Sequence, residues 1–180
     1  MALKSTIFKA ELQIADMDRH YYADHVLTLA RHPSETDERM MVRLLAFALH
    51  ADEALAFCKG LSDADEPDLW RKDLTGAIDL WMEVGQPDER RIAKACGRAR
   101  QVAVYCYGAT SGVWWNQIDT KLARFRNLAV FSLPPAHTQA LAALAQRTMR
   151  LQCSIQDGHV FLTDGTATVE IAPVTLRAGH

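Results

Sequence analysis

The alternation of hydrophobic and polar residues begins near the start of the chain. Apolar side chains occupy positions 8, 10, 12 and 14, and polar ones occupy positions 9, 11 and 13. This is the period of a strand that is buried on one face. A turn at residues 16–19 separates it from a second apolar run over residues 21–30, which ends at His32-Pro33-Ser34. The pattern predicts a long N-terminal β-hairpin.

The hydrophobic period changes to that of a helix over residues 37–57. Because apolar residues recur there at helical spacing with little relief elsewhere, we expect a deeply packed helix. The apolar positions are Met40, Met41, Leu44, Leu45, Ala48 and Leu55. The polar residues of this segment form a narrow stripe on one side of the helix, made of Arg39, Arg43, His50 and Glu53.

The middle of the chain predicts a strand, helix and strand unit. A polar linker at residues 59–66 leads into a strand that opens with Pro67-Asp68-Leu69-Trp70, and a turn at residues 74–76 leads into an apolar strand over residues 78–84. Two acids after Pro87 favour a helix from about Pro87 to Arg100, followed by a buried strand over residues 102–107. A crossover of this length predicts parallel, right-handed pairing of the two strands.

The last third of the chain predicts a strand, a helix and a meander. We expect a strand at residues 129–133, an Ala-rich helix at 135–146 and three short strands between 148 and 170. Asp157-Gly158 and Asp164-Gly165 are strong hairpin turns, so these strands should form a closing antiparallel meander. We therefore predict one α/β domain over residues 1–180, with a mixed sheet flanked by helices.

Composition and charge narrow the choice of partners. The chain has 180 residues, and 20 Lys and Arg against 22 Asp and Glu give a net charge of -2. Because the whole molecule has no basic field, any nucleic-acid surface must be local. No apolar run approaches the roughly 18 residues of a membrane span, and the first residues lack the apolar stretch of a signal peptide. We expect a cytoplasmic protein without a membrane partner.

Cysteine and histidine spacing does not indicate a zinc site. The four cysteines, Cys58, Cys96, Cys106 and Cys153, form no CxxC pair and stand among apolar neighbours. We expect them to be reduced thiols of the core. His20 and His25 are five residues apart in an extended segment, so they do not share a helical face as the two histidines of a metalloprotease must.

Two acidic residues of the central hairpin carry the candidate chemistry. Its turn is centred near Thr75, so residues whose numbers sum to about 150 should face each other across the two strands, and Asp68 should lie opposite residue 82 or 83. This places Asp68 beside Glu83. Two neighbouring carboxylates must share a proton or bind a cation, because like charges at short range raise one pKa. Oxygen ligands of this kind suit Mg²⁺ or Mn²⁺.

The same residues carry a resemblance to a known family. The order of elements around the Pro-Asp and the later Glu resembles the PD-(D/E)xK nuclease superfamily. More narrowly, Pro67-Asp68-Leu69-Trp70 together with the run from Trp81 to Asp88 is similar to the YaeQ family of bacterial proteins, over nearly the whole chain. The superfamily resemblance implies a restriction-endonuclease-like fold and metal-dependent phosphodiester cleavage. It also implies that Asp68 and Glu83 hold the ion, joined by an acid of the first helix, here Glu53.

The chain departs from the superfamily motif at the lysine, which should stand two residues after Glu83 where this chain has Gly85. That lysine would orient the attacking water and offset charge on the phosphate. Gln86 is adjacent, and Arg90, Lys94 and Arg98 form a basic ridge on the following helix that could reach back or contact nucleic acid. Two hypotheses stay open. One is a nuclease with Gln86, Arg90 or Lys94 in place of the lysine, and the other is a degenerate nuclease fold that binds nucleic acid or a protein without cutting.

Overall fold

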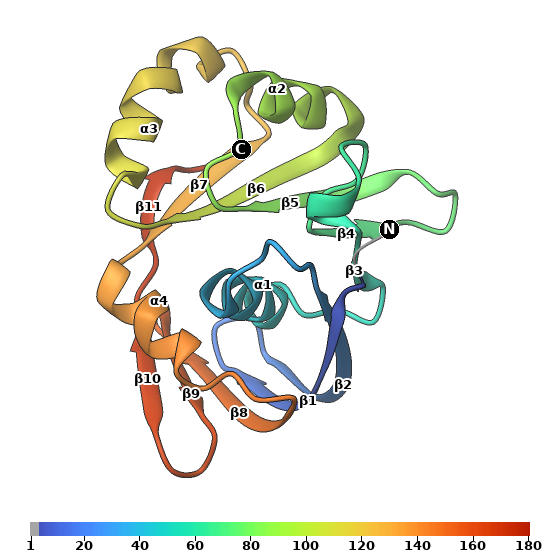
Figure 1. Ribbon diagram of the computed structural model, residues 1–180. Helices are drawn as coiled ribbons and strands as arrows, with labels where there is room; N and C mark the ends of the chain where they lie inside the picture. The colour runs from blue at the N-terminus through green and yellow to red at the C-terminus, as the bar shows by residue number, and fades with distance from the viewer. Residues whose placement is uncertain (1–3) are drawn as a thin grey trace. The chain divides into compact units, whose positions relative to one another are not determined.

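The computed structural model describes residues 4–180, which form two compact units. The first unit extends to Leu49 and includes Ala136–Pro173, and the second comprises His50–Pro135 and Val174–His180. Each unit is built on its own mixed sheet, so the fold is mixed α/β with two mixed sheets and flanking helices (Figure 1). The assignment of residues 1–180 to a single domain stays a prediction.

The sheet of the first unit has the strand order β10-β9-β8-β1-β2. The predicted N-terminal hairpin is confirmed, because β1 and β2 pair antiparallel without interruption from Thr6 opposite Arg31 to Asp16 opposite Tyr21. The closing meander is also confirmed, and its strand β8 pairs parallel with β1, which the local pattern did not predict. The strands are β1 (Thr6–Asp16), β2 (Tyr21–Arg31), β8 (Thr148–Gln156), β9 (His159–Thr163) and β10 (Thr168–Ile171).

The first unit also contains α1 (Asp37–Leu49), which is buried at nine of its thirteen positions. The predicted extension of this helix to residue 57 is wrong. Asp52 ends the segment with a turn, in which its carboxylate accepts a hydrogen bond from the N–H of Ala54, and β3 (Leu55–Phe57) follows. β3 pairs with the strand at Leu69–Lys72, and this pairing satisfies its backbone hydrogen-bonding groups. Helical spacing within residues 37–57 does not reveal such a pairing. The Ala-rich helix is confirmed as α4, but it ends at Ala142 (Pro135–Ala142).

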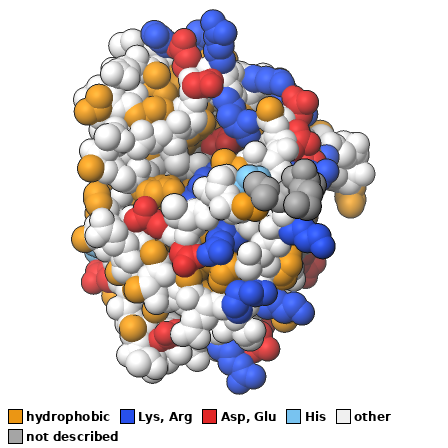
Figure 2. Space-filling view, in the orientation of Figure 1, with side chains coloured by type: hydrophobic (Ala, Val, Ile, Leu, Met, Phe, Trp, Pro, Cys, Tyr) orange, Lys and Arg blue, Asp and Glu red, His pale blue; other side chains and the backbone are white. Residues whose placement is uncertain are grey.

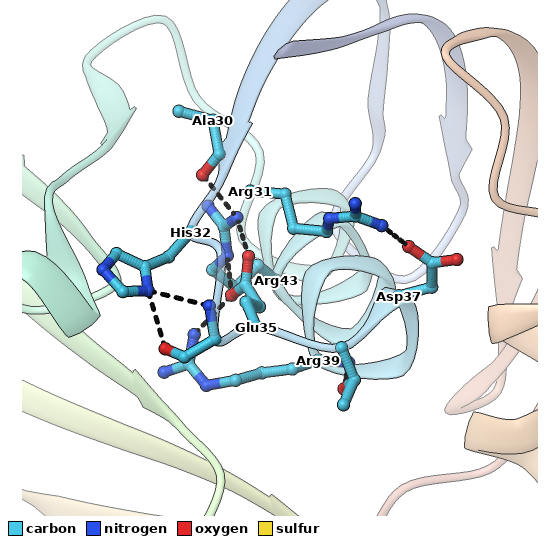
Figure 3. Close-up of polar contacts among 9 residues, drawn as sticks. Ala30, Arg31, His32, Glu35, Asp37, Arg39 and Arg43 are labelled. Carbon is cyan, nitrogen blue, oxygen red and sulfur yellow. Dashed lines mark hydrogen bonds and ion pairs between the residues drawn. The ribbon is translucent and has the colours of Figure 1, made fainter. Parts of the chain in front are cut away.

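A buried ionic cluster fixes the start of α1. The carboxylate of Glu35 accepts hydrogen bonds from Arg39 at 2.6 Å and from Arg43 at 2.6 and 2.9 Å, and Arg43 also donates to the carbonyl of Ala30 (Figure 3). Glu35 and Arg43 are only 7% and 4% exposed. Two residues of the predicted polar stripe, Arg39 and Arg43, therefore neutralise a buried acid that precedes the helix.

The second unit has the strand order β11-β7-β6-β5-β4-β3. The predicted strand, helix and strand unit is confirmed, because β5 and β6, which precede and follow α2 along the chain, pair in parallel. Helices α2 and α3 lie on one face of this sheet and cover a core that includes Trp81, Ile92 and Val104 (Figure 1). The elements are β4 (Leu69–Lys72), β5 (Ile78–Val84), α2 (Glu89–Arg98), β6 (Ala99–Tyr107), α3 (Ser111–Ile118), β7 (Leu128–Leu133) and β11 (Val174–Arg177), with short 3₁₀ turns at Gly60–Ser62 and Thr120–Leu122.

The face of the molecule drawn in Figure 2 carries side chains of both charges. In Figure 2, Lys and Arg side chains lie next to Asp and Glu side chains rather than in a field of one sign. The four cysteines are free, and three of them are buried. No helix within residues 4–180 is long and apolar enough to cross a membrane.

Candidate acidic site on the central hairpin

The hairpin of β4 and β5 brings Asp68 and Glu83 to the same end of the sheet. Leu69 faces Met82 in the register, and the N–H of Asp68 donates to the carbonyl of Met82 at 3.1 Å. The turn is fixed by Asp73, whose carboxylate accepts hydrogen bonds from the N–H groups of Thr75 and Ala77. The predicted register is therefore confirmed, and it makes Asp68 and Glu83 neighbours.

Both acids are almost completely buried, with Asp68 1% and Glu83 3% exposed. One oxygen of Asp68, Oδ2, accepts a hydrogen bond from the N–H of Val84 at 2.8 Å. The Oε1 atom of Glu83 accepts two, from the indole of Trp81 and from Nε of Arg91, each at 2.8 Å. The site thus consists of two buried carboxyl groups, one guanidinium and one indole.

Burial, and to a smaller extent the charge of Asp68, raise the pKa of Glu83 from its ordinary 4.5 to about 7. The charge of Arg91 and the hydrogen bonds from Trp81 and Arg91 oppose this rise only in part. Glu83 therefore changes its charge near neutral pH. A carboxyl group in this state can accept or release a proton or take a cation.

Arg91 is the cation that the structure places at Glu83, although the sequence pattern did not single it out. It lies in the first turn of α2, where the N-cap Asp88 accepts a hydrogen bond from its backbone N–H. Its guanidinium donates to Glu83 and also to the carbonyl oxygens of Ala64 at 3.0 Å and Glu66 at 2.7 Å. Arg91 therefore joins the acidic pair to the segment that precedes it.

That segment, Gly60 to Pro67, covers Asp68. Gly60 has a positive φ of 47°, and a Cβ atom built there would lie 2.5 Å from Oδ1 of Asp68. The N–H of Gly60 donates to the carbonyl of Pro67, and the N–H of Lys59 donates to the carboxylate of Glu66. Only glycine fits at position 60 without displacing the buried carboxylate. We name residues 60–67 the covering segment.

The predicted basic ridge also contacts the covering segment. Nζ of Lys94 lies 2.8 Å from a carboxylate oxygen of Asp65, and Arg98 donates to the carbonyl of the same residue at 3.0 Å. The Arg98 guanidinium additionally stacks over the ring of Trp81 at 5.0 Å. Arg90 is exposed. The face of α2 that meets the segment is formed by Arg91, Lys94 and Arg98.

Two other predicted site residues lie elsewhere. Gln86 is exposed, and its amide donates to the carbonyl of Tyr107 and to the hydroxyl of Thr110. Glu53 was expected on the helical stripe, but α1 ends at Leu49 and Glu53 is exposed in the following turn. The expected helical position of Glu53 is therefore wrong. Gly85 follows the end of β5 with a φ of 100°.

Asp68 and Glu83 are not part of a larger cluster of metal-ligating side chains within the residues that the structure describes. Across residues 4–180, no group of three or more His, Cys, Asp or Glu side chains is placed to hold a metal ion. Glu53 therefore does not complete a three-acid set with Asp68 and Glu83.

Comparison with known proteins places the chain in a family. The family model described as YaeQ protein matches residues 1–173. The chain belongs to the YaeQ family. It is 51% identical to the uncharacterized protein YaeQ of Salmonella typhi and 49% identical to that of Escherichia coli K12, in each case over 172 residues and 95% of both chains.

Solved structures of the same family share the fold. The crystal structure of the YaeQ protein from Xanthomonas axonopodis pv. citri is 54% identical, with a TM-score of 0.93 over 97% of this chain and 99% of that one. The YaeQ protein from Pseudomonas syringae is 38% identical, also with a TM-score of 0.93, over 97% of each chain. The mixed α/β architecture is thus common to these family members.

Proposed function

We propose that this chain is a nuclease-like protein of restriction-endonuclease-like fold that hydrolyses nucleic-acid phosphodiesters with a divalent cation held by Asp68 and Glu83. The observation that carries the proposal is the burial of two neighbouring carboxyl groups, one on β5 and one immediately before the facing strand β4. An isolated ionised carboxylate is costly inside a protein, so such a pair needs a proton, a cation or both. The resemblance of the surrounding motif to the PD-(D/E)xK superfamily supports the same choice.

The donor set fits a hard cation. Both residues offer carboxylate oxygens, which Mg²⁺ and Mn²⁺ prefer, and the two hydrogen bonds to Glu83 converge on Oε1. Asp68 and Glu83 would hold the divalent cation, which would supply Lewis-acid chemistry for phosphodiester hydrolysis. In our proposal Trp81 orients Glu83, and the backbone N–H of Val84 holds Asp68.

Arg91 takes the role that the missing lysine would have. It lies 2.8 Å from Glu83 and is always charged, whereas Gly85 carries no side chain at the motif position. A guanidinium can donate to two oxygens of a phosphate at once and offset charge that develops in the transition state. Lys94, the residue favoured by spacing alone, binds Asp65 instead.

A phosphodiester can reach the buried acids only when the covering segment moves. Its outer contact, the ion pair of Lys94 with Asp65, has side chains that are 57% and 74% exposed. Exposed ion pairs contribute little to stability, so this contact opposes opening weakly. Lys94 and Arg98 would then be released to contact the nucleic-acid backbone beside the exposed Arg90, with an affinity that falls as salt is added.

The alternative function is binding of nucleic acid or a protein without cleavage. The observation that favours it is Gly85 at the lysine position, together with the contacts that already occupy Arg91, Lys94 and Arg98. A degenerate site of this kind has no need of an ion between its acids.

The proposal is tested by titrating Mn²⁺ into the protein in a calorimeter and by measuring Mg²⁺-dependent cleavage of labelled DNA and RNA. Asp68→Asn should abolish both properties. Asp79→Asn is the matched control, because Asp79 lies on β5, the strand that carries Glu83, but pairs with Arg100. Arg91→Gln should slow cleavage by about 100-fold, the scale of losing one transition-state contact, and should leave the Mn²⁺ affinity nearly unchanged. Lys94→Ala should slow cleavage less.

Three results would contradict the proposal. Mn²⁺ binding that survives Asp68→Asn would place the ion elsewhere. Cleavage that survives Asp68→Asn would identify a contaminant or another site. Nucleic-acid binding with no cleavage by the parent protein at any Mg²⁺ or Mn²⁺ concentration would establish the alternative.

A further inference from the structure

The sheet of the second unit has a cavity of about 330 Å³ on the face opposite the acidic site. Side chains alternate along a strand, so Trp81 and Glu83 lie on one face of β5 while Leu80 lies on the other. Trp81 belongs to the core under α2, whereas Leu80 lines the cavity. The cavity is therefore separate from the carboxyl pair and does not depend on the proposed function.

Two alanines create the hollow. Ala103 of β6 and Ala129 of β7 face each other directly in the parallel register, and both line the cavity. The next paired positions on the same face carry two large rings, Tyr105 and Phe131, which stack with centroids 5.0 Å apart and planes 20° apart. Phe131 also lines the cavity. A small floor beside an aromatic wall leaves a slot that suits a flat ring.

The polar groups at the cavity are uncharged amides and hydroxyls, with two histidines. Gln101 and Thr175 are exposed at its edge, and the Asn127 amide is held by the carbonyls of Cys96 and Ala99. None of the described residues that line the cavity is Asp, Glu, Lys or Arg. The lining thus offers a charged ligand no carboxylate, ammonium or guanidinium partner, which favours a neutral ring.

Size and hydrogen bonding narrow the ligand class. A dry cavity of about 150 Å³ holds one benzene ring, so the present volume suits about two fused rings. It also falls within the range of about 300 to 1,000 Å³ that is usual for ligand pockets. The Gln101 amide offers a donor beside an acceptor, the pair that glutamine uses to bind adjacent N6 and N7 atoms of adenine.

We propose that this cavity is a binding site for an adenine-type purine ring, with the ring between the Ala103–Ala129 floor and Phe131 and its hydrogen-bonding edge on Gln101. The apolar floor and the aromatic wall stabilise the ring by burial and contact, and the amide selects its edge. A free nucleoside and an unpaired base of a nucleic acid share this chemistry.

The test is calorimetric titration of the full chain with adenosine, and separately with single-stranded oligoadenylate. Adenosine should bind with a Kd of about 1 mM or lower. Gln101→Ala changes an exposed residue and should weaken binding at least tenfold, while Ala129→Leu should abolish it by filling the floor. Ala54→Leu, at an exposed turn of the same unit, is the control and should leave the affinity unchanged.

The two probes distinguish the sources of the purine. Binding of adenosine supports a free nucleoside, and binding of oligoadenylate alone supports a base presented by nucleic acid, provided that the Gln101 and Ala129 variants weaken it. The proposal is overturned if neither probe binds. It is also overturned if cytidine or oligocytidylate binds with equal affinity, or if the Gln101 and Ala129 variants leave the affinity unchanged. Asp68→Asn should leave this affinity intact, so failure of the acidic site and failure of the purine site are seen separately.

Discussion

Replacement of Glu83 by Gln should change how the stability of the second unit depends on pH. Gln has the same shape as the protonated acid, and its carbonyl can still accept from Trp81 and Arg91, which both bind Oε1 of Glu83. It has no proton to lose. The difference in unfolding free energy between the two proteins therefore isolates the titration of Glu83.

The magnitude follows from the pKa of Glu83, which burial and the charge of Asp68 raise from 4.5 to about 7. Between these values the native state binds more protons than the unfolded state, so stability falls as pH rises through this window. The loss is small below pH 4.5 and complete above about pH 7. A tenfold change in a protonation equilibrium is worth 1.36 kcal/mol, so the wild type should lose about 3 kcal/mol relative to Glu83→Gln.

The assay is urea unfolding in the presence of a chelator, from pH 4.5 to about pH 8, followed by tryptophan fluorescence. All four tryptophans lie in the second unit, so the signal reports on the unit that contains Glu83. Asp73→Asn is the control, because Asp73 lies in the same unit as Glu83. Hydrogen bonds from the hydroxyl and the N–H of Thr75 lower the pKa of Asp73, so it stays ionised across the range and its effect should be constant. A pH-independent difference for Glu83→Gln would refute the reasoning.

Two further substitutions test the packing of each unit. Gly60→Ala should destabilise by about 1 to 3 kcal/mol more than Gly76→Ala in urea unfolding, because both positions have positive φ but only the first would overlap the carboxylate of Asp68, and equal losses would contradict that contact. Glu35→Gln should cost about 3 to 5 kcal/mol by circular dichroism, because it leaves Arg43 buried without its carboxylate. Adding Arg43→Met should recover part of that loss, and a loss below about 1 kcal/mol would contradict the argument.

Local patterns predicted most elements of the fold, for a physical reason. Alternation and turn chemistry act between near neighbours, so the N-terminal hairpin, β5 and the Asp157-Gly158 turn are confirmed at or near their predicted positions. Pairings between distant segments leave no such trace. The parallel pairing of β1 with β8 joins residues more than 130 positions apart, and it divides the strands between two sheets where we expected one.

The candidate site was predictable where it depends on the hairpin and not where it depends on side chains from other elements. Turn arithmetic placed Asp68 beside Glu83 because two strands and one turn fix that distance. Arg91 could have been noticed only as a cation in the first turn of the following helix. Its contacts with Ala64 and Glu66 require the covering segment to fold back on α2, which no local pattern encodes.

The contacts of Arg91 lead to a prediction that is tested by a substitution at position 91, and not by placing the motif lysine at position 85. The φ of 100° at Gly85 disfavours any other residue there, so restoring the motif lysine would add strain. Arg91→Lys keeps a charge near Glu83 but loses the planar fork that also binds Ala64 and Glu66. Hydrogen exchange at residues 60–66 should therefore increase at least tenfold in Arg91→Lys, as these contacts with α2 are lost. If opening limits access to the acids, cleavage by this variant should be retained or faster, whereas Arg91→Gln should be slow. Unchanged exchange in Arg91→Lys would show that the fork does not hold the segment closed.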